Sequence, residues 1–157
     1  MSATHTNIDR FNLAAIELFS VLYDHFPLPT DIETTEIGVE AAPEETTPVE
    51  MFRYTVYAEH ALTWLVEEGF LRYEPPNFGT CYRNVRLTLK GLTLLGYVPS
   101  SLKTGEHGEP IIAKIKRVLS GGTEKAATET VKSLLSELFK LAMTSGVSQA
   151  ASAIVNV

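Results

Sequence analysis

The four histidines, the single cysteine and the adjacent glutamates Glu67 and Glu68 are the residues whose chemistry could support catalysis or metal binding. Glu67 and Glu68 are neighbours, and neighbouring helical side chains point about 100° apart, so an acid/base dyad is not expected there. Cys81 lies two residues from Arg83, which suits either a redox-sensing thiolate or an inert strand residue. The histidines are His5, His25, His60 and His107, without the spacing of metal ligands. We therefore predict a protein that is not an enzyme and that holds no metal or cofactor.

The composition predicts one well-buried domain with an appended element. The chain has 157 residues, 45% of them hydrophobic, and a formal net charge of −6. The first third is strongly acidic, whereas basic residues slightly outnumber acidic ones from Met51 to Lys90, so an anionic partner is expected to meet the second half. A lone cysteine excludes an intramolecular disulfide, and neither a signal peptide nor an apolar span of membrane length is visible. We predict a cytoplasmic protein with no membrane partner.

The first third of the chain predicts one helix followed by an acidic loop. Thr6 and Asp9 form a helix start signal, and apolar residues then recur at three- and four-residue steps until Pro27. The segment 27–47 is rich in Pro, Thr and Glu, is most acidic over 31–45, and has few residues to bury. We interpret 27–47 as a loop insertion that contains at most one short edge strand.

A second helix is predicted to begin at Pro48, because Thr47 and Glu50 form a capping box around a proline at the first helical position. Its apolar residues fall on two nearly opposite faces. One face carries Val49, Phe52 and Val56, and the other carries Ala58, Ala61, Leu62 and Leu65. Either the chain turns between Tyr54 and Tyr57, or a single helix is buried on two sides. We favour the turn.

The middle of the chain predicts a hairpin and a short closing helix. Gly69 can end the preceding helix at Glu68 by adopting the left-handed conformation. Strands are predicted over 70–73 and 82–87, on either side of a run of strand-breaking residues. The second strand places Val85, Leu87 and Leu89 on one face. Thr88 is a good N-cap for the helix that follows.

Two further helices are predicted over 109–146. Pro110 begins one that ends at Gly121, and Thr123 is expected to cap the other. The last helix is strongly amphipathic, with apolar residues at heptad-like spacing. Its apolar face includes Val131, Leu134, Leu138 and Leu141. This face packs either onto its own domain or against a second copy, and the tail 147–157 either continues the helix or frays.

The order of these elements resembles the winged helix-turn-helix superfamily, in the style of bacterial MarR-type and PadR-type regulators. The resemblance rests on an apolar helix that ends in EEGFL (67–71), then a hairpin, then LTLKG (87–91), and it covers only the centre of the chain. It implies a mainly α fold of the α+β type. The winged-helix domain would span 6–98 with a two-stranded β-hairpin wing, and the C-terminal helical extension 109–146 would form a homodimer.

The resemblance also implies a dimeric transcriptional regulator that binds double-stranded DNA. In the superfamily, the second helix of the motif enters the major groove and the wing contacts the backbone or the minor groove. Carried onto this chain, the DNA-binding residues are Arg53, Tyr57 and His60 of the helix, with Arg72, Asn77, Arg83, Arg86 and Lys90 of the wing and its flanks. The outward residues between 56 and 68 include no lysine or arginine, so the wing and Arg53 are expected to supply the phosphate contacts.

A protein-interaction module that does not bind DNA is the alternative. Tyr57 and Trp64 lie one heptad step apart on the same side of the predicted helix, and aromatic residues dominate interface hot spots. Together with the acidic loop they would present an aromatic and acidic surface to another protein. Contact between these two aromatic residues and the chain's own terminal helices is the competing interpretation. The candidate protein interface comprises Tyr57, Trp64, Val131, Leu134, Leu138 and Leu141.

Overall fold

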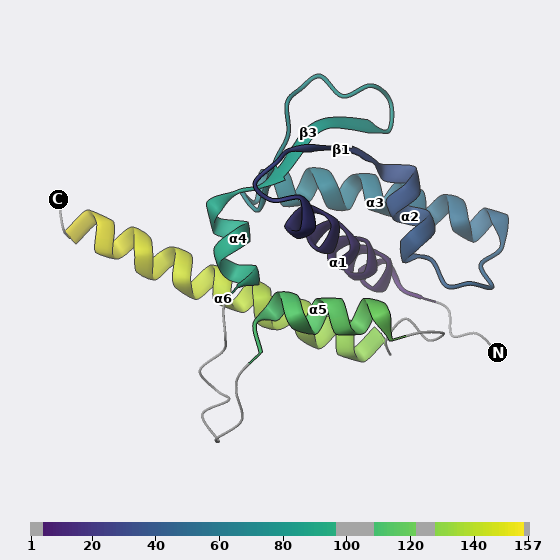
Figure 1. The fold of residues 1–157 in the computed structure, drawn as a ribbon. Coiled ribbons are helices and arrows are strands. Elements are labelled where there is room, and N and C mark those ends of the chain that lie inside the picture. The colour runs from purple at the N-terminus through teal and green to yellow at the C-terminus, as the bar shows by residue number, and fades with distance from the viewer. Residues whose placement is uncertain (1–4, 97–108, 122–127, 156–157) are drawn as a thin grey trace.

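Helices and short strands alternate through the first two thirds of the chain, and two further helices follow (Figure 1). The computed structural model describes residues 5–96, 109–121 and 128–155. Its elements are α1 (Asn7–His25), β1 (Thr30–Glu33), α2 (Thr34–Ala41), α3 (Pro48–Glu67), β2 (Leu71–Arg72), β3 (Cys81–Leu87), α4 (Leu89–Leu95), α5 (Ile111–Ser120) and α6 (Thr128–Val155). The predicted mainly helical fold is confirmed, with a small three-stranded antiparallel sheet.

Helix α1 begins where the sequence predicts it and forms the centre of the core. The Thr6 hydroxyl accepts the Asp9 N–H at 3.2 Å, and the Asp9 carboxylate accepts the Thr6 N–H at 2.8 Å, which completes a capping box. Ile16 and Phe19 are fully buried. In Figure 1, α1 has α2 and α3 on one side and α5 and α6 on the other.

The interpretation of 27–47 as a loop is wrong, apart from the strand that it allowed. β1 and α2 follow one another directly, because Ile32 and Ile37 reach the core. Helix α2 packs very closely on α3 at Gly38, where a Cβ atom would lie only 2.5 Å from Thr55 Cα. A helix that approaches its neighbour through a glycine needs few large apolar residues, so composition alone gave no sign of it.

Helix α3 is a single unbroken helix, so the predicted turn between Tyr54 and Tyr57 is wrong. It begins at Pro48 with the Thr47 cap, as predicted, and it buries Tyr54, Ala58, Ala61, Leu62 and Leu65. Only the Thr47 half of the predicted capping box is present, because the Glu50 carboxylate pairs with Arg10 and Arg53 instead. The apolar residues that suggested a second buried face are instead solvent-exposed: Val49 is 70% exposed and Phe52 is 69% exposed. The helix continues because nothing between 48 and 67 interrupts it, and the second apolar face reaches no core.

The sheet has β3 at its centre, with the order β1-β3-β2. The register pairs Ile32 with Tyr82 but Thr30 with Val85, so β3 contains one extra residue in this stretch. Asn84 lies in that stretch and has a positive φ of 52°, and its N–H donates to the Asp31 carboxylate at 3.0 Å. Because of this bulge, Tyr82 and Val85 both face the core.

β2 and β3 form a hairpin, which confirms the predicted pair of strands. We call this hairpin and its connecting loop 73–80 the wing. Gly69 ends α3 with a φ of 84°, a conformation that strains any other residue, and the Phe70 N–H donates back to the Leu65 carbonyl at 2.9 Å. The Thr88 hydroxyl accepts the Gly91 N–H, which confirms the predicted cap of α4. Leu89 was predicted to share a face with Val85 and Leu87, which is wrong: it begins α4 and is 81% exposed.

Helices α5 and α6 pack on α1 from the C-terminal end of the chain. Helix α5 begins at Ile111, one residue after the predicted start at Pro110, and α6 continues through most of the predicted tail to Val155. The predicted cap at Thr123 lies outside the described residues. Among those residues, no helix combines the length and the apolar character needed to cross a membrane.

Candidate nucleic-acid interface

The outward face of α3 is mainly apolar and carries one arginine. Helical periodicity places Val49, Phe52, Arg53, Val56 and His60 together on the side opposite the core. Val49, Phe52, Arg53 and His60 are exposed, and Val56 is half-buried. The Arg53 guanidinium pairs with the Glu50 carboxylate at 3.1 Å, so part of its charge is already neutralised. This face offers little attraction for phosphate and considerable apolar area to a partner.

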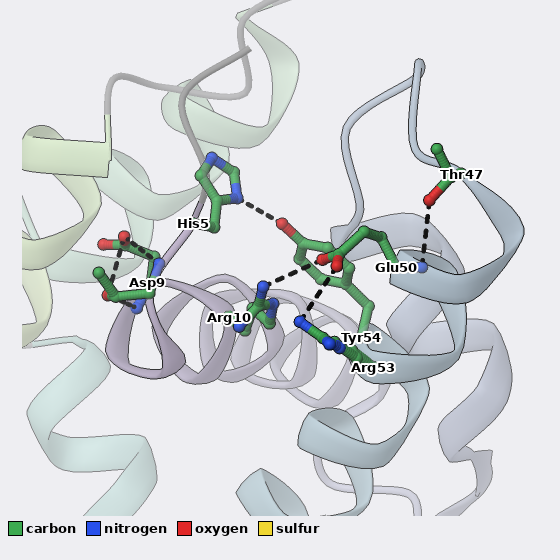
Figure 2. A network of polar contacts seen from close by, with 8 residues as sticks. His5, Asp9, Arg10, Thr47, Glu50, Arg53 and Tyr54 are labelled. Carbon is green, nitrogen blue, oxygen red and sulfur yellow. Dashed lines mark hydrogen bonds and ion pairs between the residues drawn. The ribbon is translucent and has the colours of Figure 1, made fainter.

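A buried arginine joins the start of α1 to the start of α3 (Figure 2). Arg10 is 6% exposed, and its Nη2 donates to the Glu50 carboxylate at 3.0 Å. Its guanidinium carbon lies 5.8 Å from the centre of the Tyr54 ring and 5.6 Å from that of Tyr57, within the range of cation–π attraction. Its Nε has no hydrogen-bond partner among the described residues. Glu50 therefore contacts both Arg10 and Arg53, which connects the core to the outward face of α3.

Tyr54 lies beneath the same network. The His5 ring nitrogen is within hydrogen-bonding distance of the Tyr54 hydroxyl, which ties the segment before α1 to α3 (Figure 2). Burial raises the pKa of the Tyr54 hydroxyl to about 12, despite the opposing effect of the Arg10 charge. The group is thus a neutral hydroxyl at ordinary pH, and its contacts position α1 and α3 rather than transfer protons.

Two arginines face each other across the wing. Arg72 of β2 and Arg86 of β3 are direct partners in the antiparallel register, and both are exposed. Neither forms an ion pair within the described part of the chain. Like charges directly opposite one another destabilise a strand pair. The pair lines a surface hollow together with Pro29, Tyr73, Glu74, Pro75 and Asn84.

The remaining wing residues are arranged differently from the arginine pair. Arg83 is exposed and its guanidinium carbon lies 5.8 Å from the centre of the Phe78 ring. The Asn77 side-chain amide donates to the Gly79 carbonyl at 2.8 Å, which shapes the loop rather than presenting a free amide. Lys90 donates to the Glu68 carbonyl at 2.9 Å and lies over the Phe70 ring, at the base of the wing.

A carboxylate connects α3 to the wing. The Tyr82 hydroxyl of β3 donates to the Glu59 carboxylate of α3 at 3.0 Å. Burial, followed by this hydrogen bond, raises the pKa of the Tyr82 hydroxyl to about 12. The contact fixes the wing relative to α3, so the arginine pair and the outward face of α3 keep a defined relative position.

The residues predicted to form a protein interface mostly contact other parts of their own chain. Trp64 is 38% exposed, and its ring centre lies 5.3 Å from that of Phe11 and 5.5 Å from that of Phe139 of α6. Tyr57 is half-buried beside Arg10. The competing interpretation, contact with the chain's own terminal helices, therefore applies to Trp64. In the amphipathic helix, Val131, Leu134 and Leu138 are buried in the core, and Leu141 is half-buried. A seam made of these side chains would require them to leave the core.

Arg10 is the site residue that the sequence analysis missed. It is the only lysine or arginine among the first 50 residues, which include many acidic residues, and it falls within an apolar helix pattern. A single cation within an apolar helical face was therefore the sequence feature that could have identified Arg10.

Within the described residues no group of three His, Cys, Asp or Glu side chains is close enough to hold a metal ion.

Comparison with known proteins adds no further constraint: no protein-family model, no curated protein and no solved structure matches this chain.

Proposed function

We propose that this chain is a non-catalytic winged-helix protein that binds double-stranded DNA, with the wing as its main contact. The element order α1-β1-α2-α3-β2-β3 and the sheet order β1-β3-β2 support the fold part of this proposal. A helix-turn-helix needs two packed helices ahead of the wing, and α2 and α3 meet that requirement. The motif would thus begin earlier than the sequence suggested, with α3 as its second helix.

The observation that carries the DNA part is the Arg72–Arg86 pair. Two exposed guanidinium groups on directly opposed residues, without a carboxylate ion pair, repel one another, and an anion bound to both relieves that repulsion. Duplex DNA presents phosphates in regular rows, and arginine can bind a phosphate through two hydrogen bonds. Arg83, which is exposed, would extend the contact along the wing.

The test measures the affinity of the protein for a fluorescein-labelled DNA duplex of random sequence at low salt. Replacing both Arg72 and Arg86 by alanine should weaken binding about tenfold or more. Replacing Lys132 and Lys140 by alanine removes the same formal charge from exposed positions of α6, far along the chain from the wing, and should change binding little. Equal losses in both double variants would mean that net charge alone drives the interaction. No binding by the wild-type protein at low salt would rule out the DNA proposal.

A second candidate function is a winged-helix protein-interaction module, and the outward face of α3 favours it. Val49 and Phe52 are exposed apolar side chains on the same face of this helix, and the neighbouring Arg53 is paired with Glu50. The anchors would then be Val49 and Phe52 rather than Tyr57 and Trp64. A protein partner should be lost with Phe52→Asp and retained with Arg72→Ala/Arg86→Ala, whereas DNA binding should show the opposite pattern.

A homodimer remains part of the proposal, with a different seam from the one predicted. The last turns of α6 extend past α4, away from the rest of the described chain (Figure 1). We place the contact between copies there, because the apolar face nearer the start of α6 is used by the core. Truncation after Thr144 should convert a dimer into a folded monomer in sedimentation velocity. An unchanged mass would contradict this seam.

A further inference from the structure

One edge of the sheet is open for pairing with another chain. β1 is an edge strand, with β3 as its only neighbour in the described residues. Ile32 is opposite Tyr82, and the Thr34 N–H donates to the Thr80 carbonyl at 3.0 Å. Alternate residues of an antiparallel strand point their backbone groups toward the partner strand, so the N–H and carbonyl of Asp31 and the N–H of Glu33 point away from β3. The Glu33 carbonyl is used within the chain, because Glu33 is the N-cap of α2 and its carbonyl accepts the first hydrogen bond of that helix. These outward groups have the geometry that a further strand would use.

A groove of about 480 Å³ runs beside this open edge, between β1, α2 and the second half of α1. Val21 and Val39 supply its accessible apolar surface, and Val39 is 49% exposed, whereas Ile32 and Ile37 also line the groove but are buried. The groove thus combines a free strand edge with an apolar wall, which are the two features that bind an extended peptide: backbone hydrogen bonds supply affinity, and alternate side chains enter pockets.

The charge of the groove selects the kind of peptide. Its lining includes Asp31, Glu33, Glu36 and Glu40, and no lysine or arginine is among the described residues that line it. Glu36 and Glu40 are exposed and form no ion pair in the described part of the chain. Glu33 accepts the Thr35 hydroxyl at 3.1 Å, and the Thr80 hydroxyl, as the main cause, lowers the pKa of this carboxyl, so it stays ionised at neutral pH. A basic peptide would complement these carboxylates.

We propose that this groove is a docking site for an extended, lysine- or arginine-containing segment of a protein partner, which adds to β1 as a fourth strand. The four residues of β1 span about 13 Å, which fits a segment of about four or five residues. Apolar side chains of the segment would lie against Val21 and Val39, and alternate basic side chains would meet Glu36 and Glu40. The site is separate from the proposed DNA contact, because β1 and β2 lie on opposite sides of β3.

The experiment uses a fluorescein-labelled eight-residue peptide that alternates lysine with valine, added to the full chain and followed by fluorescence anisotropy. Two further peptides serve as controls: one with glutamate in place of each lysine, and one with alternate backbone N–H groups methylated so that it keeps its charge but cannot pair with a strand. The lysine peptide should bind, and each control should bind about tenfold more weakly or worse. Equal binding of the methylated peptide would overturn strand addition, and equal binding of the glutamate peptide would overturn the charge argument.

A matched pair of protein variants locates the site. Glu36→Lys/Glu40→Lys should weaken binding of the lysine peptide about tenfold. Glu44→Lys/Glu45→Lys makes the same charge change at exposed positions that do not line the groove, and it should have a much smaller effect. Similar losses in both variants would contradict a localised site.

Hydrogen exchange on the wild-type chain provides a readout that does not depend on how the variants fold. The outward amides of Asp31 and Glu33 should exchange fast in the free protein and slow when the lysine peptide is bound. Protection that appears instead on the wing or on α3 would overturn the assignment. Protection of the same amides that rises with protein concentration in the absence of peptide would assign the groove to a second copy of this chain, and would also overturn the proposal.

Discussion

At the scale of single residues, Arg10 determines how α1 meets α3. Arg10 is 6% exposed, and burying its charge is costly, so Glu50 together with the Tyr54 and Tyr57 rings offsets that cost. Burial of this arginine could not be predicted from local sequence, because Glu50 lies 40 residues away along the chain. The exposure of the wing cations Arg72 and Arg86 was easier to predict, since alternation along a strand fixes which side chains face outward.

Removing the Glu50 charge alone should destabilise the fold more than removing the charges of both Arg10 and Glu50. Glu50→Gln leaves the guanidinium buried without a counter-charge, and we expect it to lower the free energy of unfolding by about 2 kcal/mol. Arg10→Met/Glu50→Gln should recover part of that loss. Urea denaturation of the wild type, Glu50→Gln, Arg10→Met and the double variant measures both effects. A double variant that is as unstable as the sum of its single changes would show that the pair is not coupled.

The tyrosine that links α3 to the wing predicts a loss of stability at alkaline pH. The pKa of Tyr82 is raised from 10.0 to about 12 in the folded protein, so the neutral hydroxyl is favoured by folding. This contribution is fully present below pH 10.0, where both states are protonated. It is lost as pH rises from 10.0 to about 12, because over this range the unfolded state ionises while the folded state still holds its proton. Urea denaturation across this range should show a steeper loss for the wild type than for Tyr82→Phe. Parallel slopes would contradict the assignment.

At the scale of elements, strong local signals predicted the boundaries well and tertiary contacts determined the rest. The caps at Thr6, Thr47 and Thr88 and the glycine at Gly69 operate within a few residues, so the sequence alone located the helix ends. Helix α2 was not predicted because it packs closely on α3 through Gly38, which has no side chain, and so it lacks the apolar pattern that identifies a buried helix. Helix α3 was broken in error because its exposed apolar residues were assumed to be buried.

The close contact at Gly38 makes α2 sensitive to one methyl group. Gly38→Ala would place a Cβ 2.5 Å from Thr55 Cα, so α2 must move away from α3, and we expect a loss of about 1–3 kcal/mol in the free energy of unfolding. Gly96→Ala is the matched control, because the atom nearest to its Cβ would be the Leu92 carbonyl oxygen, at 3.6 Å. Urea denaturation compares the two. Equal stability of both variants would mean that α2 and α3 are not in such close contact in solution.

At the scale of the whole molecule, α6 is part of the same core as the sheet and α1. Leu138 is fully buried, and Phe139 contacts Trp64 of α3 and Phe11 of α1. The C-terminal helices therefore stabilise the arrangement of α3, which explains why the apolar face predicted as a possible seam is not exposed. Neither interpretation of that face could be chosen from sequence, because both require the same heptad-like pattern.

This common core predicts a single unfolding transition. Leu138→Ala should lower the free energy of unfolding by about 3 kcal/mol. Trp64 fluorescence, which reports the contact with Phe139, should change at the same urea concentration as far-ultraviolet circular dichroism in both the variant and the wild type. An earlier fluorescence change would show that α6 detaches before the rest of the chain unfolds.

The most direct test of the central claim, wing-led binding of duplex DNA, is the salt dependence of the affinity. The logarithm of the association constant should fall linearly with the logarithm of salt concentration for the wild-type chain. The reason is that arginine and lysine side chains that contact phosphates release the counterions bound there. Arg72→Ala/Arg86→Ala should make that slope shallower by about two, one for each lost phosphate contact. An unchanged slope in the double variant, or a wild-type affinity that does not respond to salt, would contradict the account.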